Sequence, residues 1–321
     1  MNTDSSARRK LATPTIAMLP RIEDALSFLY LDIVRVVQDD TGVCAEITTP
    51  SRGTERVYIP TASLACVLLG PGVSVTTRAM ATMARHGTTV VVAGAGGVRT
   101  YASTPAPNLT TRWLEAQVSA WADPAKRLEV ATRMYRQRFG EDPTVAGASL
   151  ERLRGLEGQR VKALYRILAK QHRVAPFKRS YDPADWDSQN PVNLALSSAN
   201  SCLYGICHAA INAIGCSPAL GFVHTGKQQS FVYDIGDLYK AELTVPLAFS
   251  LHQSGNPEAA ARRSFRQGLR LFKLMQRIVA DIQLLLDPAL KLRVPQPDEA
   301  LTHLWDPERG PLPSGVNYGH Q

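Results

Sequence analysis

The sequence predicts an α+β fold in which a small, β-rich N-terminal domain is followed by a larger, all-α C-terminal domain. Two observations support this prediction. Short apolar runs alternate with turn signals up to about residue 104, and beyond that point apolar residues recur at helical spacing. We expect a flexible arm at 1–18, a β-rich domain at 19–104, a linker at 105–109, a helical domain at 110–295 and a flexible tail at 296–321.

The β-rich domain is predicted from strand-like runs separated by DDTG, PSRG and GPG turn signals, at 32–40, 43–49, 55–60, 62–70 and 88–103. One helix is expected over 76–86. The last run contains GAGG at 94–97, which a further strand pattern follows rather than a helix. We therefore interpret GAGG as a hairpin turn and not as a nucleotide-binding loop. Arg99 then stands on the return strand.

The C-terminal domain is predicted from helical periodicity over 111–123, 124–140, 149–174 and 190–215. A loop rich in charge joins the last two of these helices and carries Tyr181 and Trp186. Such aromatic side chains either pack locally or, beside a basic surface, stack on nucleic-acid bases.

Glu157 stands between Gly155 and Gly158 in a helix otherwise rich in Arg and Lys. Each glycine costs a helix about 1 kcal/mol relative to alanine, so we expect something to approach closely there. The alternative is that helices cross at the two glycines and that Glu157 pairs with Arg154 or Arg160.

The stretch from Gly221 to Lys240 carries a cluster of polar side chains around a predicted helix start near Asp234. Asp234 and Asp237 are three residues apart and therefore share a helix face, and His224 lies at the rim of the preceding turn. One imidazole and two carboxylates suit Mg²⁺ or Mn²⁺. The alternative for Asp234 is an N-terminal helix cap.

The net charge and the cysteine content indicate which class of protein the sequence encodes. Lys and Arg number 36 against 28 Asp and Glu, a net charge of +8 that favours polyanionic partners. The sequence has no secretory signal pattern and no run of about 18 apolar residues, so we expect no membrane association. The scattered cysteines indicate reduced core thiols in a cytoplasmic protein: Cys44, Cys66, Cys202, Cys207 and Cys216.

A helix is expected from about Pro257 to Leu286, with a basic row along one face. The row would run for about 22 Å and favours contact with a phosphate backbone; its members are Arg262, Arg266, Arg270, Lys273 and Arg277. After Pro295 the chain is rich in Pro and Gly around one apolar patch, ALTHLW, and we expect this tail to order only on a partner.

Taken together, the motifs resemble those of the CRISPR adaptation integrases, the first-numbered CRISPR-associated (Cas) endonucleases, in their type I-E form. The resemblance runs from about residue 19 to 295 through IPTASLACVLLGPG, VRTYAS, LRGLEGQRV, YDPADW, SANSCLYG, GFVHTGK and FVYDIGDLYK. It implies a catalytic α-helical domain, a homodimer, and a 4:2 complex with the second CRISPR-associated adaptation protein.

The resemblance also implies roles for single residues. The family's metal ligands fall on Glu157, His224 and Asp237, with Asp234 supporting the site, and the cofactor is Mg²⁺ or Mn²⁺. Further positions resemble family contacts near DNA or the reacting end: Arg99, Lys227, Lys240, Tyr181 and Tyr204. The tyrosine that separates duplex ends in related proteins would stand near the first strand, where this sequence has Ile33, with Tyr30 close by.

The implied reaction is a transesterification in which the 3′-OH of a short double-stranded prespacer attacks the border of a CRISPR repeat. Two other functions stay open: a DNA-binding scaffold without activity, and a metal-dependent nuclease on branched DNA without a role in integration.

Overall fold

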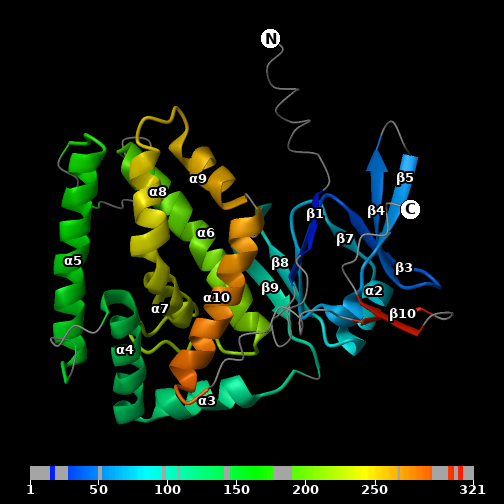
Figure 1. Ribbon diagram of the computed structural model, residues 1–321, viewed down its shortest axis with the longest axis horizontal. Helices are drawn as coiled ribbons and strands as arrows, with labels where there is room; N and C mark the ends of the chain where they lie inside the picture. The colour runs from blue at the N-terminus through cyan, green and yellow to red at the C-terminus, as the bar shows by residue number, and fades with distance from the viewer. Residues whose placement is uncertain are drawn as a thin grey trace.

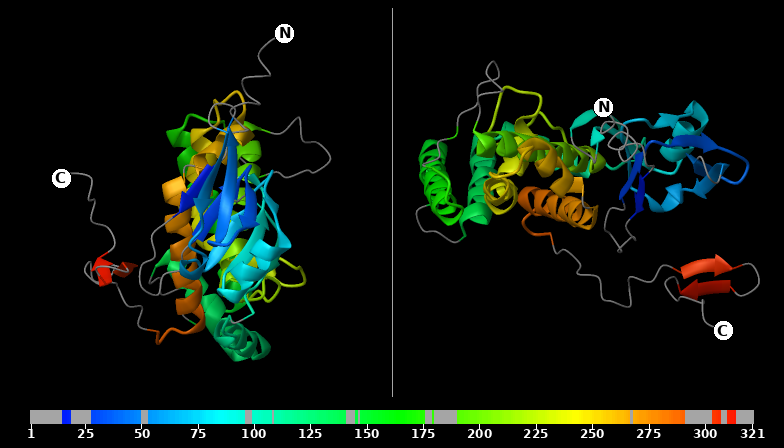
Figure 2. Two further views of the ribbon diagram at one scale, coloured as in Figure 1. Left: turned by 90° about the vertical axis from the view of Figure 1, so that its right-hand side faces the viewer. Right: turned by 90° about the horizontal axis from the view of Figure 1, so that it is seen from above.

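The computed structural model describes residues 15–18, 28–49, 53–95, 99–107, 109–140, 145, 147–175, 179, 190–266, 268–290, 303–306 and 310–313. An N-terminal β-rich region is followed by a mostly helical C-terminal part, so the predicted α+β class is confirmed (Figure 1). Figure 2 shows the two parts side by side along the long axis.

Two sheets form the N-terminal part. A five-stranded sheet has the order β1(Thr15–Met18), β2(Phe28–Asp32), β6(Cys66–Leu69), β8(Thr89–Ala93), β9(Thr100–Thr104). A four-stranded sheet has the order β5(Gly53–Tyr58), β4(Val43–Thr49), β3(Arg35–Gln38), β7(Ser74–Val75). Strands β2, β6 and β8 run parallel, a feature that the sequence patterns had not indicated.

The predicted strand over 32–40 is interrupted. β2 ends at Asp32 and β3 begins at Arg35, because Ile33 adopts a left-handed φ of 54° and redirects the chain from one sheet to the other. The predicted hairpin is confirmed, since β8 and β9 pair antiparallel on either side of GAGG. The predicted helix is also confirmed as α2(Thr77–Arg85), after the short 3₁₀ helix η1(Thr61–Ser63).

The central strands β2, β6 and β8 of the five-stranded sheet bury side chains on both of its faces, to which successive residues point alternately, whereas the edge strand β9 is largely exposed. Leu29, Val67 and Val90 face a core shared with the four-stranded sheet and α2. Phe28, Leu68 and Val91 face a larger core shared with the helices. The sheet therefore forms a middle layer, and the helical part rests directly on it.

The helical part is built around α6(Pro191–Ala213), which packs on α7, α8, α9, α10 and the strands β8 and β9. Within the described residues, α6 has the length and mean hydropathy of a membrane span, but 67% of its apolar window is buried inside the protein, as in a core helix. Around it lie α3(Arg112–Ala122), α4(Pro124–Phe139), α5(Leu150–Gln171), α7(Ser230–Tyr239), α8(Val245–Ser250), α9(Pro257–Arg266) and α10(Gly268–Leu286).

One predicted helix differs from expectation at its start. The helix expected to begin near Asp234 begins at Ser230, so the apolar run SFVYD is helical and Asp234 lies inside the helix. The helix expected over 257–286 is helical on both sides of residue 267, as α9 and α10, and residue 267 itself lies outside the described part of the chain.

A π-helix, η3(Lys240–Thr244), joins α7 to α8. Pro246 follows it and has no N–H to donate to the carbonyl four residues earlier, which favours the wider turn.

Both chain ends depart from the predicted arm and tail. Residues 15–18 form β1, which pairs with β2, and the C-terminal segment contains the hairpin β10(His303–Asp306) and β11(Gly310–Pro313). The remaining residues of the arm and tail lie outside the described part of the chain.

Candidate active site around His224 and Asp237

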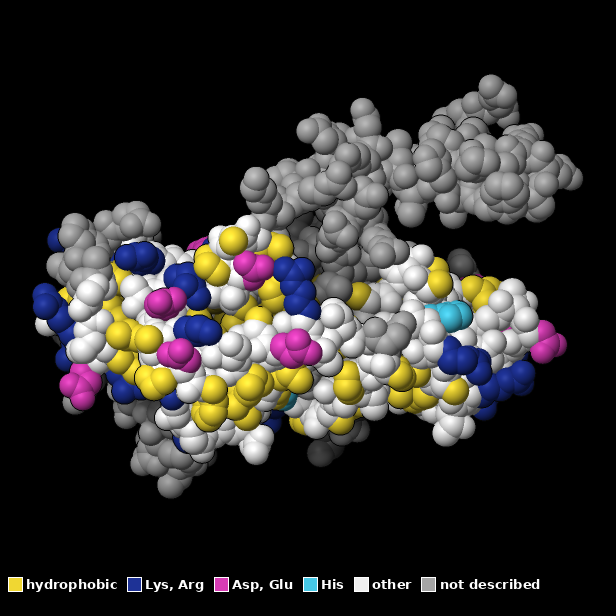
Figure 3. Space-filling model, turned by 90° about the horizontal axis from the view of Figure 1, so that it is seen from below, with side chains coloured by type: hydrophobic (Ala, Val, Ile, Leu, Met, Phe, Trp, Pro, Cys, Tyr) yellow, Lys and Arg dark blue, Asp and Glu magenta, His cyan; other side chains and the backbone are white. Residues whose placement is uncertain are grey.

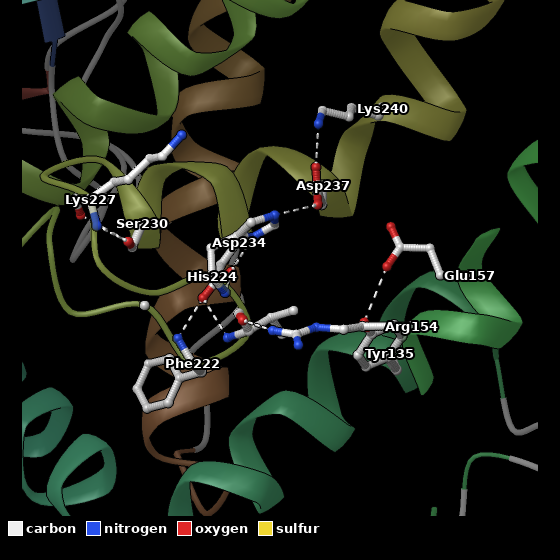
Figure 4. Close-up of polar contacts among 12 residues, drawn as sticks. Tyr135, Arg154, Glu157, Phe222, His224, Lys227, Ser230, Asp234, Asp237 and Lys240 are labelled. Carbon is white, nitrogen blue, oxygen red and sulfur yellow. Dashed lines mark hydrogen bonds and ion pairs between the residues drawn. The ribbon is translucent and has the colours of Figure 1, made fainter. Parts of the chain in front are cut away.

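Asp234 holds the loop that carries His224. Its side chain is fully buried, and its two carboxylate oxygens accept hydrogen bonds from the backbone N–H groups of Phe222 (2.5 Å), Val223 (3.0 Å) and His224 (2.8 Å) (Figure 4). The helix-cap interpretation of Asp234 is therefore wrong, because the residue lies one turn inside α7. Its carboxylate instead binds the backbone N–H groups of the loop that carries His224. A side chain at Gly221 would disrupt this arrangement, since an added Cβ would collide with the His224 carbonyl oxygen.

Asp234 also fixes the orientation of the His224 ring. Nδ1 of His224 lies 2.7 Å from Oδ1 of Asp234, so Nδ1–H donates to the carboxylate and, in the neutral ring, Nε2 carries the lone pair. Nε2 points toward Asp237, with Oδ2 at 3.9 Å. The hydrogen bond to Asp234 raises the pKa of His224, with Asp237 contributing, although burial works in the opposite direction.

The same loop is held from its other side by two arginines. Arg127 of α4 donates to the carbonyl oxygens of Phe222 (3.1 Å) and Gly221 (3.4 Å), and Arg154 of α5 donates to that of Val223 (2.5 Å). Arg127 is not among the residues predicted from the sequence, because an arginine whose partner is a distant backbone carbonyl leaves no motif. Amide and carbonyl groups of the loop are thus both fixed, and His224 has little freedom.

Asp237 lies on the next turn of α7 and faces Lys240. The Nζ atom of Lys240 is 2.5 Å from Oδ1 of Asp237, and Oδ1 is buried without a well-aligned hydrogen bond. Burial lowers the pKa of Lys240, but the charge of Asp237 outweighs it and holds the pKa above its usual value. The ammonium also lies over the ring of Tyr204, 5.0 Å from its centroid. Gly236 permits this packing, because a Cβ there would lie 2.7 Å from that ring.

Glu157 of α5 faces the same region from the opposite side (Figure 4). Its Oε1 is paired with Arg138 and its Oε2 accepts a hydrogen bond from Tyr135 at 3.1 Å, so these partners differ from the expected Arg154 or Arg160. The alternative of a helix crossing at the two glycines is wrong, because a Cβ added at Gly155 or Gly158 would meet no atom of the described residues within 4 Å, which leaves the surface of α5 open at these two positions.

The donor set suits a hard divalent cation, although it is not gathered in one place. His224 has the carboxylate-supported imidazole that metal-binding histidines use, and Asp237 offers a carboxylate whose Oδ2 faces Nε2 of His224. Octahedral Mg²⁺ needs neighbouring ligand atoms about 3 Å apart, so the 3.9 Å between His224 and Asp237 is about 1 Å too wide. Across the described residues, no three His, Cys, Asp or Glu side chains form a ready metal cluster, and the carboxylate of Glu157 is engaged by Arg138 and Tyr135.

The predicted DNA-contacting residues are only partly gathered. Arg99 and Tyr204 line a hollow of about 610 Å³ between β9 and α6, and Lys227 is exposed beside the His224 loop. Arg262, the first member of the basic row, lies 3.9 Å from the carboxylate of Glu258 and is therefore partly neutralised. Arg277, also in the row, is paired with Glu242 at 2.9 Å.

Some predicted DNA contacts cannot be placed. Tyr181 and Trp186 lie outside the described residues, as do the side chains of Arg266, Arg270 and Lys273. On the face shown in Figure 3, basic side chains gather at the helical end and at the opposite, sheet end.

The comparison with known families decides what kind of protein carries this site. The family described as CRISPR associated protein Cas1 matches residues 43–147 and 141–273. The chain belongs to the Cas1 family. It is 38% identical to the CRISPR-associated endonuclease Cas1 of Clostridium sp. (strain SY8519), covering 94% of this chain and 99% of the relative. It is 40% identical to that of Escherichia coli (strain K12), covering 87% and 90%.

A solved Cas1 structure agrees with the fold. The crystal structure titled as a TtCas1-DNA complex superposes with a TM-score of 0.74 at 40% identity, covering 84% of this chain and 99% of that one. The two-part architecture described above is therefore that of the Cas1 family.

Proposed function

We propose that this Cas1 protein is a metal-dependent DNA integrase and endonuclease of CRISPR adaptation, which inserts short foreign DNA into the CRISPR array. The observation that carries the proposal is the Asp234–His224 pair, which directs Nε2 of His224 toward Asp237, in the region that Glu157 faces from α5. Relatives named as endonucleases and a relative solved with DNA support it.

Glu157, His224 and Asp237 would hold Mg²⁺ or Mn²⁺, which supplies Lewis-acid stabilisation of the attacked phosphate and of the leaving oxygen. Asp234 keeps the imidazole in the tautomer that can bind. Lys240 balances the charge of Asp237, and its ammonium would also stabilise negative charge that develops on a phosphate bound beside Asp237. A 3′-OH as nucleophile gives strand joining, and water gives cleavage.

DNA would be held by charge rather than by sequence. We propose that Arg99, Lys227 and Tyr204 contact the DNA near the reacting end, and that the basic row that includes Arg262 contacts the phosphate backbone farther away.

We further propose a type I-E, cytoplasmic protein that forms homodimers and a 4:2 complex with the second adaptation protein. The 40% identity to the Escherichia coli relative supports the subtype. The five cysteines are all buried and none of them is in a disulfide bond, which fits a reducing compartment.

A strand-joining assay tests the proposal. A labelled duplex with 3′-OH ends is incubated with a plasmid that carries a CRISPR repeat, the partner protein and Mn²⁺. The wild type should join label to plasmid, EDTA should abolish joining, and Asp237→Asn should lower the rate at least 100-fold. Asp287→Asn, which changes a partly exposed carboxylate paired with Arg112, is the matched control and should join at the wild-type rate. Joining by Asp237→Asn at the control's rate would leave only a DNA-binding scaffold.

A further inference from the structure

Arg138 occupies a position between the two halves of the proposed metal site. It lies on α4, which packs against both α5, the helix of Glu157, and α7, the helix of Asp237. Its side chain is only 11% exposed. The rings of Tyr135 and Phe139 flank the guanidinium, with centroids 5.5 and 5.3 Å away. The group is therefore a fixed cation within the site and not a mobile surface charge.

The contacts of Arg138 use one of the oxygens that a metal ion would need. Arg138 is paired with Oε1 of Glu157, while Tyr135 donates to Oε2, so both oxygens of that carboxylate are engaged. Burial lowers the pKa of Arg138, but the hydrogen bond and charge of Glu157, together with the charge of Asp237, hold the pKa above its usual value. Arg138 thus interacts electrostatically with ligands on both sides of the site.

This placement accounts for the incomplete ligand set. A guanidinium and a divalent cation cannot share the same carboxylate oxygen, because two positive charges repel strongly at contact distance in a poorly hydrated site. While Arg138 holds Glu157, that carboxylate is unavailable, and only His224 and Asp237 lie near each other.

Building on the proposed function, we propose that Arg138 and the divalent cation alternate at Glu157. Arg138 holds the carboxylate in the metal-free protein, releases it when the cation binds, and then pairs with a phosphate of the DNA substrate. The contact between Arg138 and a substrate phosphate follows from burial, because a buried guanidinium needs another anionic partner once Glu157 binds the cation. Asp237 is already paired with Lys240, and the substrate phosphate is the anion that the reaction brings to the site.

The test compares Arg138→Met with Arg136→Met, an exposed arginine on the same helix. Mn²⁺ affinity is measured by calorimetry on the full-length protein without DNA, and strand joining is measured separately. Arg138→Met should bind Mn²⁺ about tenfold more tightly and join DNA at least tenfold more slowly, while Arg136→Met should stay within twofold of wild type in both. A merely structural role would weaken both properties. Unchanged or weaker Mn²⁺ binding by Arg138→Met would overturn the proposal.

Two further variants keep the result interpretable. Arg138→Gln retains a donor to Glu157 without the charge, so it should also tighten Mn²⁺ binding if Arg138→Met does not fold, and failure to do so would overturn the proposal. Glu157→Gln should weaken Mn²⁺ binding. If Glu157→Gln binds Mn²⁺ as tightly as the wild type does, the proposed metal site itself is wrong. If Glu157→Gln weakens binding but neither Arg138 variant tightens it, only the exchange is wrong.

Discussion

Replacing Asp234 with asparagine tests the loop that orients His224. The carboxylate accepts three backbone hydrogen bonds and one from the imidazole, two on each oxygen. An amide has one oxygen, so Asp234→Asn loses two acceptors and directs an NH₂ group at two donors. Hydrogen bonds to a charged group contribute about 1.5–3 kcal/mol each, so the free energy of unfolding should fall by about 3–6 kcal/mol. A helix cap would account for only about 1 kcal/mol.

Urea unfolding of wild type, Asp234→Asn and the surface control Asp287→Asn measures this difference. Asp287 is paired with exposed Arg112, so its variant should lose less than about 1 kcal/mol. Imidazole ¹⁵N spectra should show the Nδ1–H tautomer at His224 in the wild type and a mixture of tautomers in Asp234→Asn. A destabilisation below about 1 kcal/mol with the Nδ1–H tautomer retained would refute the role assigned to Asp234.

Three further outcomes follow from the structure. Because the pKa of His224 is raised in the folded protein, its contribution to stability is present in full below about pH 6.5 and is lost as the pH rises through the folded pKa. Mn²⁺ affinity should rise over the same pH interval, because the cation needs unprotonated Nε2. Denaturation and calorimetry at a series of pH values measure the two effects, and Mn²⁺ affinity that falls over this interval would contradict the assignment. Changing Arg262, Arg266 and Arg270 to alanine should reduce the slope of log K for DNA against log salt by about 0.9 for each phosphate that is no longer neutralised, and a wild-type slope would show that these residues are only solvated. Deleting residues 298–321 should weaken binding to the partner protein in calorimetry while the dimer persists, and unchanged affinity would exclude a docking role for the tail.

The sequence predicted the elements well where periodicity is strong. The α+β class, the β8–β9 hairpin and the helices α2 to α6 follow from turn signals and apolar spacing. It predicted the start of α7 wrongly, because SFVYD is apolar enough to suit a strand and its burial against α6 decides for a helix. It also missed the parallel pairing of β2, β6 and β8, since pairing depends on segments far apart in the chain.

The site was predictable in its residues but not in its contacts. The GFVHTGK and YDIGD motifs identified His224, Asp234 and Asp237, which the structure brings together. The resemblance could not reveal that Arg138 holds Glu157, because that pair joins helices α4 and α5, whose packing no local pattern encodes. The open face beside Gly155 and Gly158 was likewise hidden, since a helical glycine suits either a close crossing or a bound partner.

Pulsed electron paramagnetic resonance of bound Mn²⁺ tests the central claim most directly. With ¹⁵N-labelled histidine in the full-length protein, the wild type should show a ¹⁵N coupling from one directly bound imidazole. His224→Gln should lose that coupling, while His252→Gln, which changes a histidine bonded to the Phe249 carbonyl, should keep it. A wild-type spectrum without nitrogen coupling, or a coupling that survives in His224→Gln, would contradict a metal site at His224 and Asp237.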